Sequence, residues 1–167
     1  MSTLEKRKVC LLGATGVGKT SLVARFVRSI FSDRYQTTIG TKIETKHLVY
    51  GEHVLVLVLW DLSGEDEFQR VRLSYLRGAA GYLLVADGTR RATVETAMAL
   101  HQAAAEHLGD VPRVLVLNKA DLRDFWELDD AYERELASRW PVFETSAKTG
   151  AGVEEAFRAL GNALLQR

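Results

Sequence analysis

Two short, almost unbroken apolar runs, 82–87 (YLLVAD) and 113–119 (RVLVLNK), constrain the fold of this 167-residue chain more than any other feature. A strand that is apolar on both faces must be covered on both faces, which is typical of parallel strands between two helix layers. Four further β-type runs lie at 8–12, 41–49, 54–60 and 142–148. The second and third of these are joined by the tight turn YGEH, which predicts a hairpin of two antiparallel strands.

Apolar residues recur at helical spacing in the segments between these runs, which predicts helices with one face on the core. The positions are Leu22, Val23, Phe26, Val27 and Ile30, then Val94, Ala97, Met98, His101, Ala105 and Leu108, and finally Val153, Ala156, Phe157, Leu160 and Leu164. Further helices are expected within 127–138 and 66–77. Strands that alternate with helices predict an α/β fold, and the length predicts a single domain over residues 1–167.

Composition and charge exclude several classes of protein. The 22 basic residues balance 22 acidic ones, which gives no reason to expect nucleic acid or an anionic membrane as a partner. No apolar stretch reaches the ~20 residues of a membrane span, and the first residues do not resemble a signal peptide. Cys10, the only cysteine, lies in an apolar run and is expected to be buried. We therefore expect a cytoplasmic monomer.

The two ends of the chain carry no lipidation motif. The last residues, GNALLQR, hold no cysteine for a prenyl group, and Ser2 stands where myristoylation requires glycine. From the sequence we expect no direct membrane anchor.

Residues 13–20 (GATGVGKT) fit the pattern G-x-x-x-x-G-K-[ST] between an expected strand and an expected helix. Glycines let consecutive backbone N–H groups surround phosphate oxygens at the positive end of that helix. Lys19 adds a mobile positive charge, and the Thr20 hydroxyl is an oxygen ligand of the kind that Mg²⁺ prefers. The alternative is a glycine-rich turn with a chance lysine, which the strand and helix context disfavours. The expected nucleotide contacts are Gly13, Thr15, Gly16, Val17, Gly18, Lys19, Thr20 and Ser21.

A second motif, LNKAD at 117–121, ends a buried strand and bears on the choice of base. The Asp121 carboxylate can accept both N1–H and the exocyclic amine of guanine, donors that adenine does not offer together. Lys119 could lay its aliphatic stem over the purine, and ETSAK at 144–148 offers the Ala147 N–H to the guanine carbonyl. Alone, NKAD would be read as a surface turn, but its order with the other motifs favours guanine. The expected contacts are Asn118, Lys119, Asp121, Ser146, Ala147 and Lys148.

Together, GATGVGKTS, TTIG, WDLSG, NKAD and ETSAK resemble the five motifs of the Ras-like small GTPases, with Rab proteins the most similar group. The resemblance spans nearly the whole chain. It implies a P-loop GTPase fold, a three-layer sandwich with a six-stranded, mostly parallel sheet, an antiparallel second strand and about five helices. It also implies a switch that binds GTP or GDP with Mg²⁺ and meets effectors, an exchange factor and an activating protein through residues 31–45 and 60–77.

The resemblance assigns further roles within those two segments. Thr38 would bind Mg²⁺ and sense the γ-phosphate, Asp61 would hold Mg²⁺ through water, and Gly64 would donate its N–H to the γ-phosphate. Phe31 would pack against guanine, although a single aromatic at a helix end is also an ordinary cap on the core. Tyr35 would close over the phosphates. Trp60 would contribute to the partner-binding surface or lie mostly in the core.

Two positions depart from the family pattern. Glu65 follows the glycine of WDLSG, where most members have the glutamine that orients the attacking water. Its carboxylate could act as a base, or the γ-phosphate could repel it beside Asp66 and Glu67. Thr15 stands at a loop position where Ras has glycine and many Rab proteins have serine.

The sequence therefore predicts a GTPase whose catalytic residues are Lys19, Thr38, Gly64 and Glu65, with Mg²⁺ held by Thr20, Thr38 and Asp61. Hydrolysis is expected to be slow without a partner, and Arg34 is a weak candidate for an arginine acting in cis. One alternative is a GTP-binding module with little or no hydrolysis, because Glu65 replaces glutamine. Another is a P-loop kinase, in which NKAD would have no function.

Overall fold

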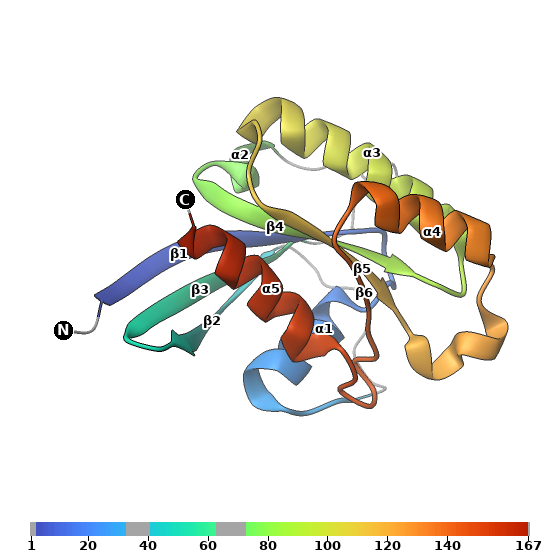
Figure 1. The fold of residues 1–167 in the computed structure, drawn as a ribbon, viewed down its shortest axis with the longest axis horizontal. Coiled ribbons are helices and arrows are strands. Elements are labelled where there is room, and N and C mark those ends of the chain that lie inside the picture. The colour runs from blue at the N-terminus through green and yellow to red at the C-terminus, as the bar shows by residue number, and fades with distance from the viewer. Residues whose placement is uncertain (1–2, 33–40, 63–72, 167) are drawn as a thin grey trace.

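The computed structural model describes residues 3–32, 41–62 and 73–166, and its centre is a six-stranded sheet (Figure 1). The sheet order is β2-β3-β1-β4-β5-β6, and β2 alone pairs antiparallel with its neighbour. The strands are β1 (Thr3–Leu12), β2 (Thr41–Tyr50), β3 (His53–Leu62), β4 (Ala79–Asp87), β5 (Arg113–Asn118) and β6 (Val142–Glu144). The predicted α/β fold with an antiparallel second strand is confirmed.

Helices cover both faces of this sheet, in agreement with the three-layer sandwich that was predicted (Figure 1). On one face lie α1 (Lys19–Arg28) and α5 (Val153–Leu165). On the other lie α2 (Leu73–Leu76), α3 (Arg91–Leu108) and α4 (Asp130–Arg139). A 3₁₀ helix, η1 (Ala120–Phe125), follows β5. The described residues thus hold five α-helices, as expected, and one 3₁₀ helix.

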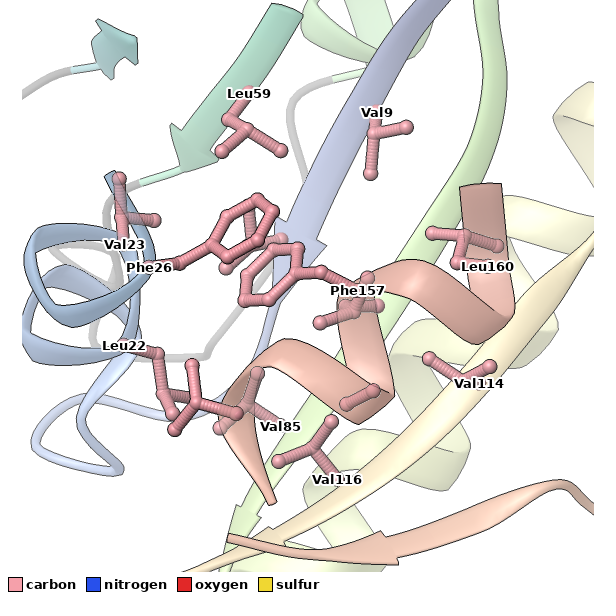
Figure 2. Packing of buried hydrophobic residues seen from close by; sticks show 14 of the residues in the cluster. Val9, Leu22, Val23, Phe26, Leu59, Val85, Val114, Val116, Phe157 and Leu160 are labelled. Carbon is pink, nitrogen blue, oxygen red and sulfur yellow. The ribbon is translucent and has the colours of Figure 1, made fainter. Parts of the chain in front are cut away.

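The core is divided by the pleat of the strands. Val9 and Leu11 of β1 point into the cluster under α1 and α5, whereas Cys10 and Leu12 point into the cluster under α3. In the first cluster the rings of Phe26 and Phe157 stack with centroids 4.1 Å apart and planes 2° from parallel, which joins α1 to α5 (Figure 2). Cys10 is buried, as predicted.

The strand ends differ from the predictions where the sequence is polar. β1 begins at Thr3 and not at residue 8, because its first half pairs with β3 alone and polar side chains are tolerated there. β6 ends at Glu144 and not at residue 148, since the chain turns at Thr145 to form a loop that is part of the site below. For β1 the apolar run marks only the part of the strand that pairs on both sides, whereas for β6 the predicted range continues past the strand into the loop.

The helix predictions also need correction at particular residues. Ile30 is not on the core face: α1 ends at Arg28, Ser29 takes a left-handed conformation, and Ile30 is 48% exposed. The helix expected within 127–138 is α4, shifted toward Arg139. Of the helix expected within 66–77, the described residues contain only α2. In α3 the predicted Val94 and Ala97 are fully buried, but toward its end Ala104 is fully buried in place of Ala105, which is partly exposed.

Candidate functional site

Five of the six strands run parallel, so their carboxyl ends meet at one edge of the sheet. The loop after β1, the end of β3, the loop after β4, and the segments after β5 and β6 all open onto this edge. In open α/β sheets this edge is where ligands bind, because loops and helix N-termini converge there. All the described residues of the predicted site belong to these segments or to the neighbouring α1 and its C-terminal loop.

The loop after β1 leads directly into α1 and carries the predicted phosphate contacts. Gly18 caps the helix with φ of 102°, and a Cβ there would lie 2.4 Å from the Asn118 Nδ2 atom. Glycine is therefore required for both conformation and space. Lys19 is 7% exposed, and its Nζ donates to the carbonyl oxygens of Gly13 at 2.9 Å and Ala14 at 3.3 Å.

Electrostatics at Lys19 suit an anion. Burial lowers the pKa of the Lys19 ammonium, and attraction to Asp61 opposes this shift. A buried cation of this kind is stabilised by any anion that replaces the water it has lost. In the absence of an anion, the hydrogen bonds to Gly13 and Ala14 hold the Lys19 ammonium in place.

Next to Lys19, the Thr20 Oγ1 atom donates to the Asp61 Oδ2 atom at 2.6 Å, which joins α1 to the end of β3. Asp61 is 1% exposed. A hydroxyl and a carboxylate oxygen at this separation form the hard-oxygen donor set that suits Mg²⁺. Within the described ranges, no group of three or more His, Cys, Asp or Glu side chains gathers into a metal site. Among the described residues, a cation here would therefore be bound by the Thr20 hydroxyl and the Asp61 carboxylate, and oxygens of a bound ligand would complete its coordination.

Asn118, at the end of β5, connects three segments of the site. Its side-chain Nδ2 donates to the Val17 carbonyl of the first loop at 3.0 Å. Its Oδ1 accepts from the Thr145 hydroxyl at 3.0 Å and from the Ala147 N–H at 3.3 Å. Asn118 is only 2% exposed, so its amide positions these loops. Sequence reasoning placed Asn118 in the site but missed Thr145.

The acidic residue of NKAD lies at the surface beside the loop after β6. Asp121 is exposed, and its Oδ1 accepts a hydrogen bond of 2.7 Å from the buried Ser146 hydroxyl. Ser146 also accepts from the Thr149 N–H at 3.1 Å, which closes the loop on itself. The hydrogen bond to Oδ1 thus orients the Asp121 carboxylate while the side chain stays exposed to solvent.

Arg25 of α1 donates two hydrogen bonds to the same loop after β6. Its Nε donates to the Ala147 carbonyl at 2.8 Å and its Nη2 to the Lys148 carbonyl at 2.5 Å. The sequence showed Arg25 only as a polar position of a helix, so this contact could not be foreseen. Together with Asn118, it orients the backbone of residues 147–148 from two sides.

Lys119 makes an ion pair that the sequence did not predict. Its Nζ lies 2.8 Å from the Asp87 Oδ2 atom at the end of β4. Arg90 Nε approaches the same oxygen at 3.0 Å. Burial by itself raises the pKa of the Asp87 carboxyl, but hydrogen bonds from Lys119, Thr89 and Arg90 hold it below its usual range. The position of Asp87 at the carboxyl end of a central strand was the one signal available.

Two aromatic residues have contacts in this structure that bear on their expected roles. Phe31 is partly buried and packs against the core cluster under α1 and α5. Trp60 packs at the edge of the other cluster, with the Lys8 ammonium 3.7 Å from its ring centroid. Both residues therefore have core contacts, as the alternative interpretation of each held.

Ser21 follows Thr20 in the first turn of α1 and is partly buried. Gly13, Thr15, Gly16 and Val17 complete the same loop. The remaining expected residues, Arg34, Tyr35, Thr38, Gly64 and Glu65, lie outside the described residues.

No helix within 3–32, 41–62 and 73–166 is both long enough and apolar enough to cross a lipid bilayer.

Comparison with known proteins agrees with this geometry. The sequence profile of the Ras family matches residues 8–166. The Ras-related protein RABA1e of Arabidopsis thaliana is 37% identical over 153 residues, which cover 90% of this chain and 70% of the relative. The Ras-related protein Rab-31 of Rattus norvegicus is 35% identical over 163 residues, covering 96% and 84%. The chain therefore belongs to the Ras family and is a Rab-like small GTPase.

Proposed function

We propose that the edge formed by residues 13–20, 61, 118–121 and 146–148 binds GTP and GDP, and that nucleotide exchange and hydrolysis switch the protein between two states. The hydrogen bonds of Asn118 carry this proposal. They tie the loop that begins α1 to the two segments expected to read the base. The proposed phosphate and base contacts would thus belong to one hydrogen-bonded unit.

On the phosphate side, the N–H groups of the loop and the Lys19 ammonium would neutralise the β- and γ-phosphates. Thr20 and Asp61, together with Thr38, would hold Mg²⁺, which supplies charge neutralisation at the phosphate oxygens. The hydrogen bond between Thr20 and Asp61 keeps these two ligands adjacent. Lys19 would exchange its bonds to Gly13 and Ala14 for bonds to phosphate.

On the base side, the Asp121 carboxylate would accept the two guanine donors while the Ser146 hydroxyl holds one of its oxygens. The Ala147 N–H, now in a long bond to Asn118, would donate to the guanine carbonyl. Lys119 would cover one face of the purine while its ammonium stays paired with Asp87. Adenine lacks the donors that Asp121 requires, so guanine would be selected.

Hydrolysis is proposed to be slow unless an activating partner assists. The alternative within the same family is a module that binds GTP and scarcely hydrolyses it, because Glu65 replaces the glutamine that orients the attacking water. Single-turnover phosphate release from wild type, Glu65→Gln and Glu65→Ala separates the two. Equal rates in all three would remove Glu65 from the mechanism, and affinity for GDP should stay unchanged in each.

Partners are proposed to dock on residues 31–45 and 60–77. Within the described part of these segments, Ile43 of β2 is 50% exposed. β2 is the edge strand of the sheet, where a partner can add a strand, and Ile43 contributes apolar area beside that edge. Effectors, an exchange factor and an activating protein would meet the chain here.

The test of nucleotide identity uses the purified protein and two variants. Chromatography of the released nucleotide should show GDP or GTP, and adenine nucleotide would contradict the proposal. Asp121→Asn should shift preference from guanine to xanthine nucleotides, because an amide donates where the carboxylate accepted. Asp124→Asn, a nearby exposed carboxylate in η1, is the matched control and should keep the preference for GTP.

A further inference from the structure

Arg90, at the start of α3, touches the phosphate loop from a segment that none of the family motifs includes. Its Nη2 donates to the Thr15 carbonyl at 3.2 Å, and a Cβ on Gly16 would lie 3.4 Å from the same nitrogen. Its Nε is bonded to the Asp87 carboxylate at 3.0 Å. The side chain is 47% exposed, so it lies at the rim of the site.

The bond to Thr15 constrains the direction of a neighbouring N–H group. Thr15 C=O and Gly16 N–H belong to one peptide plane, and in a trans peptide they point in opposite directions. No cis peptide bond occurs among the described residues. A guanidinium that holds the carbonyl on one side therefore directs the Gly16 N–H to the other side. Gly16 has φ of 79°, so this peptide could otherwise rotate easily.

Asp87 fixes the guanidinium and links it to the base side. The Asp87 carboxylate is 1% exposed and receives both Arg90 and Lys119, while Thr89 donates its N–H and its hydroxyl to the other oxygen. Two cations from different loops thus share one buried anion. Arginine suits this position, since its planar fork can hold a carboxylate and a carbonyl at once.

We propose that Arg90 is a positioning residue for the nucleotide: held by Asp87, it orients the Thr15–Gly16 peptide so that its N–H faces the phosphates, and it couples that peptide to Lys119 of the base side. This inference rests on the proposed nucleotide site. It adds a contact from the start of α3 that sets how long the nucleotide stays bound. Arg90 acts through Thr15 and need not touch the nucleotide itself.

The experiment compares Arg90→Gln with Arg91→Gln, which removes an equal charge one residue away. The Arg91 guanidinium lies 4.0 Å from the centroid of the Tyr132 ring, on α4, and the backbone N–H of Arg91 donates to the Glu127 Oε1 atom at 2.7 Å. Release of fluorescent GDP and of a non-hydrolysable GTP analogue is measured for both variants. We expect release about tenfold faster for Arg90→Gln, the change that follows loss of a charged hydrogen bond, and no change for Arg91→Gln.

Two further measurements separate positioning from a role in the fold or from charge alone. Without nucleotide, Arg90→Gln should melt below Arg91→Gln, because the buried Asp87 carboxylate loses one of its two cations, and the stabilisation by added GDP should also be smaller than for Arg91→Gln. Arg90→Lys keeps the charge but cannot make both bonds, so its release rate should lie between those of wild type and Arg90→Gln.

Three outcomes would overturn the proposal: wild-type release from Arg90→Gln, equal acceleration in Arg91→Gln, or full rescue by lysine. A lower melting temperature of nucleotide-free Arg90→Gln together with wild-type stabilisation by GDP would also overturn it, as a sign of a purely structural role. If the wild-type protein bound no guanine nucleotide, the proposed function itself would fail, which is a different result from these.

Discussion

Asn118 and Lys19 are both polar and almost completely buried, at 2% and 7% exposed, yet their hydrogen bonds differ in what they join. Asn118 belongs to the proposed guanine side, residues 118–121 and 144–148, and bonds three separate segments together. Lys19 belongs to the proposed phosphate side, residues 13–20 and 61, and bonds carbonyls of its own loop. The first set of bonds builds the structure, whereas the second occupies groups that a ligand would need.

If the proposed site binds a nucleotide, its two sides would do so in different ways. On the guanine side a base would add to groups already oriented, because Asp121 and the loop of Ala147 are held by Ser146, Asn118 and Arg25. On the phosphate side a ligand must replace the bonds of Lys19 and the bond between Thr20 and Asp61. That replacement is favourable only for a strongly charged ligand.

The largest expected effect is a loss of GTP affinity when a group of the proposed phosphate side is removed. Lys19→Ala should weaken GTP binding by about 100-fold or more, since each charged hydrogen bond to phosphate contributes about 1.5–3 kcal/mol. The nucleotide-free fold should be little changed, because the lost bonds lie within one loop and a costly buried charge disappears with them. Titration with fluorescent GTP and melting without nucleotide measure the two. Undiminished affinity would refute the assignment of this loop.

The next largest effect is a loss of stability when the buried hydrogen bonds of the proposed guanine side are removed. Asn118→Ala should lower the free energy of unfolding without nucleotide by about 2–3 kcal/mol, because Val17, Thr145 and Ala147 each lose a buried partner. Urea unfolding measures this loss. Thr145→Val removes one of the three bonds and should cost about 1 kcal/mol. If Asn118→Ala were as stable as Lys19→Ala, the contrast between the two sides would not hold.

A third substitution acts where the two sides meet. Gly18→Ala places a methyl group 2.4 Å from Asn118 Nδ2 at φ of 102°, so it should destabilise the protein by about 1–3 kcal/mol and weaken nucleotide binding. Gly51→Ala is the control: φ is 62° and nothing lies within 4 Å of the new atom. It should cost about 1 kcal/mol from the backbone alone, with normal binding. Equal losses in the two variants would mean that the contact with Asn118 is easily relieved.

The smallest of these effects is the change in GTP affinity with pH, which follows the protonation of Lys19. Because burial lowers the pKa of Lys19, its charge is lost as pH rises toward 10.5, and GTP affinity should fall in that window. Stability of the nucleotide-free protein should rise there, since the unfolded chain keeps more protons than the folded one. Affinity measured from pH 7 to 10 should fall more steeply for wild type than for Lys19→Ala. If the affinities of wild type and Lys19→Ala changed with pH in parallel, the pH dependence would come from the nucleotide and not from Lys19.

Much of the fold could be predicted because burial on both faces leaves a clear record in the sequence. Residues 82–87 of β4 are all fully buried, and their run of apolar letters identified the strand. The polar first half of β1 was missed, since a segment paired on one side only needs no apolar run. The end of α1 was also missed, because Ile30 continues the helical spacing although the left-handed Ser29 has already turned the chain away.

The sequence by itself determined which groups could meet a nucleotide: the motif residues of the phosphate loop, NKAD and SAK are local patterns with a readable chemistry. Only the tertiary structure decided how those groups are held. Asn118 bonds Val17 across 101 positions and Arg90 bonds Thr15 across 75, and Asp87 receives both Lys119 and Arg90. Such contacts depend on which strand ends become neighbours when the sheet forms, and no local pattern of residues records that order.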